Sequence, residues 1–331
     1  MKRIEPRLTE KFRKDPDTEN FLARFNDILA PYQEEDYISD LPEEFPTVHV
    51  VGVPRSGTTL LVQLLAAHTD LGYINNLIAA FWRAPVYGIR LSKQVLPKET
   101  NISFRSEFGR TKGVQEPHEF GYFWSENLGY REMLEQTEEH DKKVDWERLR
   151  LILLNMVHAF GRPVLFKSFL LGWHIRTMQK VLPKTCWVHI RRDPIQNAIS
   201  LIRLRENFLG SREKWASLKP QEFSWLKNRS CWEQVAGQVY FIERSLFSQL
   251  QTVSPENVVH LNYAELCSIP LKVLEKVEQM LAVQGVKVEN REPPGTFNLN
   301  ETALADVPGS DEIVSAWEHL CSEFGPLPVD F

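Results

Sequence analysis

The sequence contains few cysteines and no close pairing among them. Its 331 residues include four cysteines, Cys186, Cys231, Cys267 and Cys321, and no two of them have the short spacing of a zinc site. Widely spaced cysteines are typical of reduced, buried thiols and argue against a disulfide framework. We therefore expect a cytoplasmic protein without a bound metal.

An excess of positive charge and a long apolar run are also missing. Lys and Arg total 39 against 44 Asp and Glu, a formal net charge of -5, which disfavours nucleic acid and heparin-like polyanions as partners. The apolar runs near Leu60 and Ala79 are too short to span a bilayer, and no apolar segment follows Met1. We therefore expect no stable membrane insertion.

What the sequence does contain is an alternation of short apolar runs and helical periodicity. Four runs rich in β-branched and aromatic residues are VHVV from Val48, PVLFKS at 163–168, TCWVHIRR at 185–192 and NVVHLNY at 257–263. Helical spacing occupies 145–160, 171–181, 194–205, 231–251, 271–281 and 310–324. This order predicts an α/β fold with a central parallel sheet flanked by helices.

The same pattern predicts how the chain is organised. The charged residues 1–46 indicate an N-terminal helical extension, and 47–331 indicate a single domain. An irregular, aromatic-rich insertion at about 73–140 follows the first strand and helix. Because ligands of such sheets bind beyond the carboxyl ends of the strands, we expect this insertion to form an acceptor pocket or a lid.

The first strand leads into a glycine-bracketed loop, GVPRSGTTL, that begins at Gly52. Two glycines with four residues between them let backbone amides turn around an anion, and the following helix adds its positive end. Arg55 contributes a full charge. Thr58 stands where an ATP-binding loop carries the lysine that reaches the β- and γ-phosphates. The loop therefore suits a ligand with a single 5′-phosphate better than a nucleoside triphosphate.

This loop resembles the 5′-phosphosulfate-binding loop of the sulfotransferases that use 3′-phosphoadenosine 5′-phosphosulfate (PAPS). The form with arginine is similar to that of the tyrosylprotein and bacterial members. The resemblance implies a P-loop-type sulfotransferase fold and a set of loop residues that bind the donor: Arg55, Ser56, Gly57, Thr58 and Thr59.

Three further segments follow the family's chain order. In RRDPIQNAIS, Arg192 and Ser200 resemble the arginine and serine that grip the 3′-phosphate, and Arg191 is interpreted as a solvated neighbour or a substitute ligand. LFKSF is similar to the segment that carries a catalytic lysine, which implies this role for Lys167. NYAEL resembles the late family turn in which Tyr263 contacts adenine, although packing is the alternative role for this tyrosine.

A hydroxyl acceptor also requires a general base, and the family uses histidine or glutamate. GVQEPHEFGYFW offers Glu119, then His118 and then Glu116, with the role of a helix-capping carboxylate as the alternative. His174 is a weaker candidate that we expect to pack under the sheet. The aromatic residues Phe81, Trp82, Phe120, Tyr122, Phe123 and Trp124 are interpreted as either core or the wall of an apolar acceptor pocket.

The resemblance implies transfer of a sulfuryl group from PAPS to a hydroxyl, less readily to an amine, with release of PAP. Arg55 and Lys167 would stabilise charge, and no metal would be needed. A small or amphipathic acceptor is favoured over a long polysaccharide; the sequence specifies neither the acceptor nor an oligomeric state. The alternatives are an atypical P-loop kinase and a non-catalytic nucleotide-binding module of the same fold.

Overall fold

The centre of the molecule is a parallel β-sheet. The computed structural model describes residues 8–97, 101–289 and 291–328, and within them five strands pair in the order β2-β3-β1-β4-β5. They are β1 (Thr47–Val51), β2 (Gly72–Tyr73), β3 (Val164–Lys167), β4 (Cys186–Arg191) and β5 (Val258–Asn262). This confirms the predicted α/β fold. Among these strands only β2 was not predicted from the sequence, because a two-residue strand is too short to show an alternation of apolar and polar residues.

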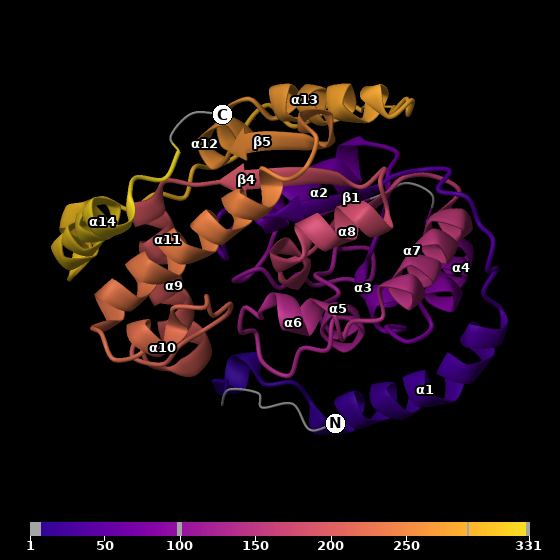
Figure 1. Ribbon diagram of the computed structural model, residues 1–331, viewed down its shortest axis with the longest axis horizontal. Coiled ribbons are helices and arrows are strands. Elements are labelled where there is room, and N and C mark those ends of the chain that lie inside the picture. Colours follow the sequence, from indigo (N-terminus) through magenta and orange to yellow (C-terminus); the bar gives the residue numbers. More distant parts are fainter. Residues whose placement is uncertain (1–7, 98–100, 290, 329–331) are drawn as a thin grey trace.

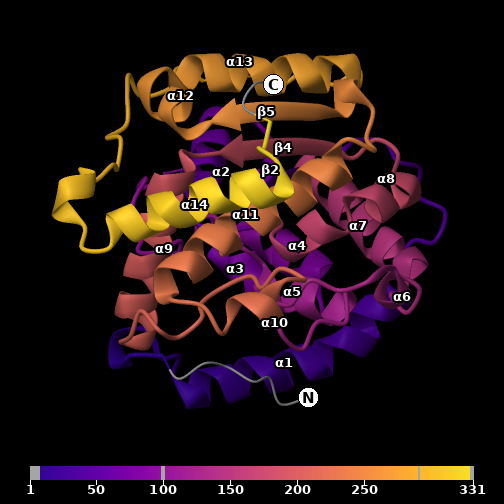
Figure 2. The same ribbon diagram turned by 60° about the vertical axis from the view of Figure 1, so that its left-hand side comes forward.

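The strands alternate between two apolar clusters, as a buried sheet requires. Val48 and Val50 of β1 pack with α2 (Thr58–His68) and α13 (Pro270–Val283) on one face. Val51 packs into the larger cluster on the other face, which includes residues of α7 (Trp146–Phe160) and α11 (Cys231–Leu250). Both ribbon views place α13 next to β5 (Figures 1 and 2). The sheet is thus covered on both faces. Because the strands are parallel, their carboxyl ends lie along the same edge of the sheet.

The long helices lie where helical spacing predicts them, with one break. Besides α7, α11 and α13, α9 (Pro194–Leu209) and α14 (Ser310–Phe324) match their predicted segments. The predicted helix at 171–181 is instead a short 3-10 helix, η2 (Leu170–Trp173), followed by α8 (Ile175–Val181). His174 separates them, with a φ of -124° outside the helical range. Its buried ring bonds to Tyr130 and Asp141, which fixes the residue between the two helices.

The remaining elements are short, apart from the first long helix. α1 (Pro16–Glu35) follows η1 (Glu10–Phe12) and begins at Asp15, whose side chain accepts a hydrogen bond from the Thr18 N–H. It lies on the far side of the molecule from α13 in both views (Figures 1 and 2). The division of the chain into an extension, a domain and an insertion stays a prediction. The other elements are α3 (Asn76–Ala79), α4 (Pro85–Val95), α5 (Gly121–Asn127), α6 (Glu138–Asp141), α10 (Phe223–Leu226), η3 (Pro255–Asn257), α12 (Tyr263–Ser268) and η4 (Leu304–Asp306).

The described residues contain neither a membrane-spanning helix nor a metal-binding cluster. Across 8–97, 101–289 and 291–328, no helix has the length and apolar character needed to cross a membrane. The same part of the chain contains no cluster of three or more His, Cys, Asp or Glu side chains arranged to hold a metal ion.

The half-buried carboxylate of Glu135 makes stability depend on pH. Burial raises the pKa of Glu135 from 4.5 to about 7, against the opposing hydrogen bonds from Ser245 and the Gln221 N–H. Between these two values the folded chain holds a proton that the unfolded chain releases. The folded state therefore loses stability as pH rises through this window, and the penalty is complete above about pH 7.

We expect Glu135→Gln to remove this penalty, because an amide mimics the protonated acid. At pH 8 the variant should be more stable than the wild type by up to about 3 kcal/mol, and near pH 4 the difference should vanish. Urea unfolding at both pH values measures it, with the exposed Glu138→Gln as control. An equal difference at both pH values would contradict the assignment.

Candidate active site

The glycine-bracketed loop connects β1 to α2 in a conformation that needs both glycines. A β-carbon on Gly52 would lie 2.5 Å from the Ile190 carbonyl oxygen, and one on Gly57 would lie 2.4 Å from the Tyr263 ring. Gly57 has a φ of 105° and forms the N-cap of α2, so N–H groups of the first helical turn lack intrahelical partners. Arg55 has a φ of 76°, a conformation that costs free energy and recurs at functional sites.

Three buried polar atoms around this loop find no hydrogen-bond partner within the described residues. They are Ser56 Oγ, Arg192 Nε and Asn197 Oδ1. The Asn197 amide nitrogen also donates to the Pro54 carbonyl over 2.9 Å, which ties the loop to α9. A cavity of about 30 Å³ lies against all three side chains. Ser56 Oγ and Arg192 Nε can donate hydrogen bonds, whereas Asn197 Oδ1 only accepts them. The two donors, beside free helix N–H groups, fit a bound phosphate of the nucleotide that the loop implies.

Arg192 and Ser200 both contact Arg55. Arg192 follows the last residue of β4, and its Nη1 donates to the Arg55 carbonyl over 3.3 Å. Ser200 Oγ, on α9, accepts a hydrogen bond of 3.2 Å from Arg55 Nε. The Arg192 guanidinium carbon lies 4.7 Å from the centre of the Tyr263 ring. The two residues of the predicted 3′-phosphate element therefore do come together, and the loop arginine joins them.

The charges of this region favour an anion. Burial, and then the neighbouring charge of Arg192, lower the pKa of Arg55 to about 10. Burial also lowers the pKa of Arg192. Two guanidinium groups that are partly removed from water and close to one another are stabilised by a negative ligand. A bound phosphate would therefore restore the pKa of both.

A lysine, a threonine and a glutamate meet at the carboxyl end of β3. Lys167, the last residue of that strand, donates from Nζ to Thr59 Oγ1 over 2.9 Å and lies 3.3 Å from Glu119 Oε2. The Lys167 side chain is 5% exposed, whereas that of Glu119 is 37% exposed. The arrangement brings a buried cation to the phosphate loop and leaves the carboxylate open to an incoming molecule.

The structure distinguishes among the candidate bases. The carboxylate of Glu116 is buried and accepts hydrogen bonds from Gln63 Nε2 (2.9 Å) and the Ser103 N–H (2.6 Å), so it holds chain segments together. His118 Nδ1 accepts from the Phe120 N–H over 2.8 Å, which leaves the proton of the neutral ring on Nε2. Desolvation lowers the pKa of His118 to about 4, although the residue keeps part of its surface in contact with solvent.

In this arrangement the hydrogen bond from the Phe120 N–H occupies the Nδ1 lone pair and Nε2 carries the proton, so the ring offers no free acceptor nitrogen to a substrate hydroxyl. The alternative role of Glu119 as a helix cap also fails, because Phe120 is the N-cap of α5 and no side chain caps that helix. His174 is buried and bonds to Tyr130 and Asp141, as its predicted packing role requires.

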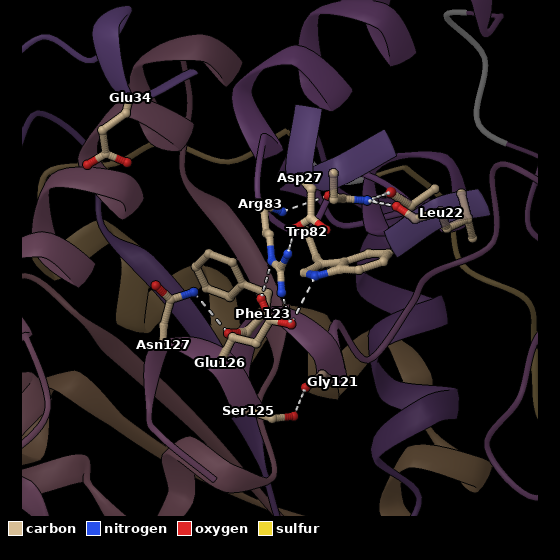
Figure 3. Close-up of polar contacts among 12 residues, drawn as sticks. Leu22, Asp27, Glu34, Trp82, Arg83, Gly121, Phe123, Ser125, Glu126 and Asn127 are labelled. Carbon is tan, nitrogen blue, oxygen red and sulfur yellow. Dashed lines mark hydrogen bonds and ion pairs between the residues drawn. The ribbon is translucent and has the colours of Figure 1, made fainter. Parts of the chain in front are cut away.

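Ion pairs hold the helix that follows Glu119. Arg83 Nε donates to Glu126 Oε2 over 2.8 Å, and the guanidinium also pairs with Asp27 of α1. Trp82 Nε1 donates to Glu126 Oε1 over 3.2 Å. Figure 3 shows these contacts converging on Glu126, in α5. They connect α5 with α1 and with the segment between α3 and α4.

The aromatic residues of the insertion divide between the core and the site. Those that are at most 8% exposed and belong to the core are Phe81, Trp82, Phe120, Phe123 and Trp124. Tyr122 is partly exposed. Two aromatic residues outside the predicted set lie closer to the charged groups. The Phe169 ring centre is 4.9 Å from Lys167 Nζ, and the Phe108 ring centre is 5.4 Å from the Arg55 guanidinium carbon.

Two other contacts of the site were not apparent in the sequence. Arg191, interpreted above as a solvated neighbour, instead pairs with the buried Glu243, from Nε to Oε1 over 2.7 Å. Gln196 exchanges two hydrogen bonds of 2.9 Å with the backbone of Thr302, and Arg192 donates to the Asn300 carbonyl. Contacts with backbone groups leave no residue signature in the sequence, so these contacts could not be predicted from it.

Comparisons with known proteins agree with this fold. Residues 46–286 match the profile of the sulfotransferase family. The omega-hydroxy-beta-dihydromenaquinone-9 sulfotransferases Stf3 of Mycobacterium bovis and Mycobacterium tuberculosis are each 24% identical over 286 residues, which covers 80% of this chain and 70% of theirs. The crystal structure of sulfotransferase STF9 from Mycobacterium avium superposes with a TM-score of 0.52 at 16% identity, over 98% of this chain and 80% of that one.

Because the family profile covers most of the sequence, the chain belongs to the sulfotransferase family. The structural likeness supports the fold alone at this identity, and the predicted P-loop-type sulfotransferase fold is confirmed.

Proposed function

We propose that this protein transfers a sulfuryl group from PAPS to a hydroxyl group of an apolar or amphipathic acceptor. The observation that carries the proposal is the meeting of Lys167, Thr59 and Glu119 beside the phosphate loop. Family membership supports the reaction class. The remaining roles follow from where each side chain lies.

The donor would be held at both of its phosphate ends. Ser56, Thr58 and Thr59, with the N–H groups at the start of α2, provide hydrogen bonds for the 5′-phosphate. Arg192 and Ser200 would hold the 3′-phosphate, with Arg55 between them. Tyr263, against Arg192 and Gly57, has a flat surface for the adenine. When bound, PAPS supplies a sulfuryl group that is already activated for transfer.

The transfer itself requires a base and a charged environment. Glu119 removes the proton from the acceptor hydroxyl and releases it to solvent, with which its carboxylate is in contact. Lys167 and Arg55 stabilise the negative charge that moves from the acceptor oxygen toward the 5′-phosphate. Thr59 orients the lysine through its 2.9 Å hydrogen bond. No step in this scheme needs a metal ligand from the protein.

Apolar side chains beside these groups support the acceptor class. Phe169 and Phe108 lie near Lys167 and Arg55, and the partly exposed Tyr122 follows Glu119 by three positions. Such surroundings suit a hydrophobic body that carries a hydroxyl. The relatives named for a hydroxylated menaquinone point in the same direction.

The two alternative functions fit less well. A P-loop kinase would need a lysine at position 58, where the chain has threonine. A non-catalytic module would have no use for a buried lysine paired with an accessible glutamate, and both are present.

Selective binding of PAP tests the proposal. At roughly 100 times its dissociation constant, PAP should stabilise the fold by about 2.7 kcal/mol, a rise of a few degrees in the unfolding midpoint. ADP, which lacks the 3′-phosphate, and ATP with magnesium should give much smaller shifts. Equal shifts with PAP and ADP would remove the support for 3′-phosphate recognition.

Arg192→Ala should weaken PAP binding by about ten- to a hundredfold, because a charged hydrogen bond to phosphate is worth about 1.5 to 3 kcal/mol. Calorimetric titration with PAP measures the change. The matched control is Arg203→Ala, at an exposed position of α9, which should bind PAP as the wild type does. Similar affinities of both variants would place the 3′-phosphate elsewhere.

A further inference from the structure

A tight turn lies directly over the proposed transfer centre. Glu107 and Arg110 exchange two backbone hydrogen bonds, of 2.8 and 3.0 Å. The two residues between them, Phe108 and Gly109, have φ values of 49° and 89°. Two consecutive positive φ angles are typical of the type I′ turn, which strongly prefers glycine. We call residues 107–110 the covering turn.

The tip of the covering turn meets the charged groups of the site. A β-carbon on Gly109 would lie 3.5 Å from Thr59 Oγ1, 3.6 Å from Lys167 Nζ and 3.9 Å from Arg55 Nη1. One methyl group would therefore touch all three side chains that converge on the transferred group. The absence of a side chain at Gly109 keeps that space open.

Residues near the start of the described chain hold the covering turn in place. The Phe108 ring packs against Phe12 and Phe208, with ring centres 6.1 and 5.6 Å away. Arg110 Nη1 donates to the Phe12 carbonyl over 2.7 Å, and Lys11 pairs with Glu107. Phe12 itself is 5% exposed. Segment 10–12 thus bonds to both ends of the turn and packs against its aromatic tip.

We propose that the covering turn encloses one side of the sulfuryl-transfer site and that Gly109 leaves the space for the transferred group. Phe12 holds the covering turn in place through its contact with Phe108. The inference rests on the proposed function. The tip of the turn, Phe108 and Gly109, carries no titratable side chain; it positions and encloses the group between Arg55, Thr59 and Lys167. Glu119 lies outside this enclosure with its carboxylate partly exposed, so the acceptor approaches from its side.

The first test adds a methyl group to the covering turn at position 109. Gly109→Ala should lower kcat for transfer from PAPS by about 100-fold, because a small displacement of the reacting groups has this effect. PAP, which lacks the sulfuryl group, should still bind with nearly wild-type affinity by calorimetry. Gly113→Ala is the matched control: its φ is 108°, so backbone strain is similar, and its β-carbon would meet only Glu116 Cγ, at 3.7 Å.

The second test removes the contact between Phe12 and Phe108. Phe12→Ala should speed tryptic cleavage after Arg105, Arg110 or Lys112 by about tenfold, since these exposed residues flank or belong to the turn and cleavage follows the open population. Phe21→Ala, at an exposed position of α1, should leave the cleavage rate unchanged. This readout does not depend on PAPS.

Three outcomes would overturn the inference. Equal kcat values for the Gly109 and Gly113 variants would contradict the role of Gly109. Unchanged proteolysis of Phe12→Ala would contradict the role of Phe12 in holding the covering turn. A Gly109→Ala variant that loses PAP binding and transfer together would show a general disruption of the site. Failure of the wild type to bind PAP is distinguishable from all three, because it would overturn the proposed function and this inference with it.

Discussion

Replacing Glu119 by glutamine is expected to lower kcat for sulfuryl transfer by about 10²- to 10⁴-fold, the usual contribution of a general base. The amide keeps the size of the side chain but accepts no proton. Glu119 contacts Lys167 and not the phosphate loop, so PAP binding should remain unchanged. Steady-state turnover with a hydroxyl acceptor found by screening with labelled PAPS, together with PAP calorimetry, separates the two effects.

Two further variants make the Glu119 experiment decisive. His118→Asn keeps an acceptor for the Phe120 N–H and should retain most activity, because the structure gives the ring no free site for a proton. The exposed Glu138→Gln should behave as the wild type. Loss of turnover in His118→Asn, with full turnover in Glu119→Gln, would transfer the role of base to the histidine.

The second large effect is expected for Lys167→Met, which removes the buried cation but keeps an unbranched side chain. Loss of one preorganised donor at a centre of developing charge typically lowers kcat by about 10²- to 10³-fold. The variant also leaves Thr59 and Glu119 without their shared partner. Single-turnover kinetics measure the transfer step, and the exposed Lys180→Met is the control.

The double variant Lys167→Met with Glu119→Gln tests whether the two side chains act together. Residues that contact one another and share a role give non-additive effects, so the double variant should be only slightly slower than the slower single variant. Fully multiplicative losses would indicate that the lysine and the glutamate act independently, against the proposed scheme.

Much of the fold followed from local patterns. Short apolar runs and helical spacing predicted four of the five described strands and most long helices within one to four residues at each end, because burial on both sheet faces imposes these patterns on the sequence. The helix predicted at 171–181 was wrong at His174. There a side chain that bonds to Tyr130 and Asp141 overrides helical propensity.

The candidate site was predictable only where one segment carries the chemistry. The loop from Gly52 to Thr59 has its own signature, since glycines and hydroxyls must stand at fixed positions around a phosphate. The choice among Glu116, His118 and Glu119 had no such signature. It depended on the Gln63 amide, the Phe120 N–H and Lys167, which come from three different parts of the chain.

The sequence by itself determined the α/β fold, the phosphate loop and the resemblance to sulfotransferases, because each depends on spacing within a short segment. Only the tertiary structure decided which carboxylate meets Lys167, that Arg55 contacts both Arg192 and Ser200, and that Gly109 lies against Arg55, Thr59 and Lys167. These contacts join residues far apart in the chain. Their geometry is set by the order of strands in the sheet and by packing, which no local pattern of residues records.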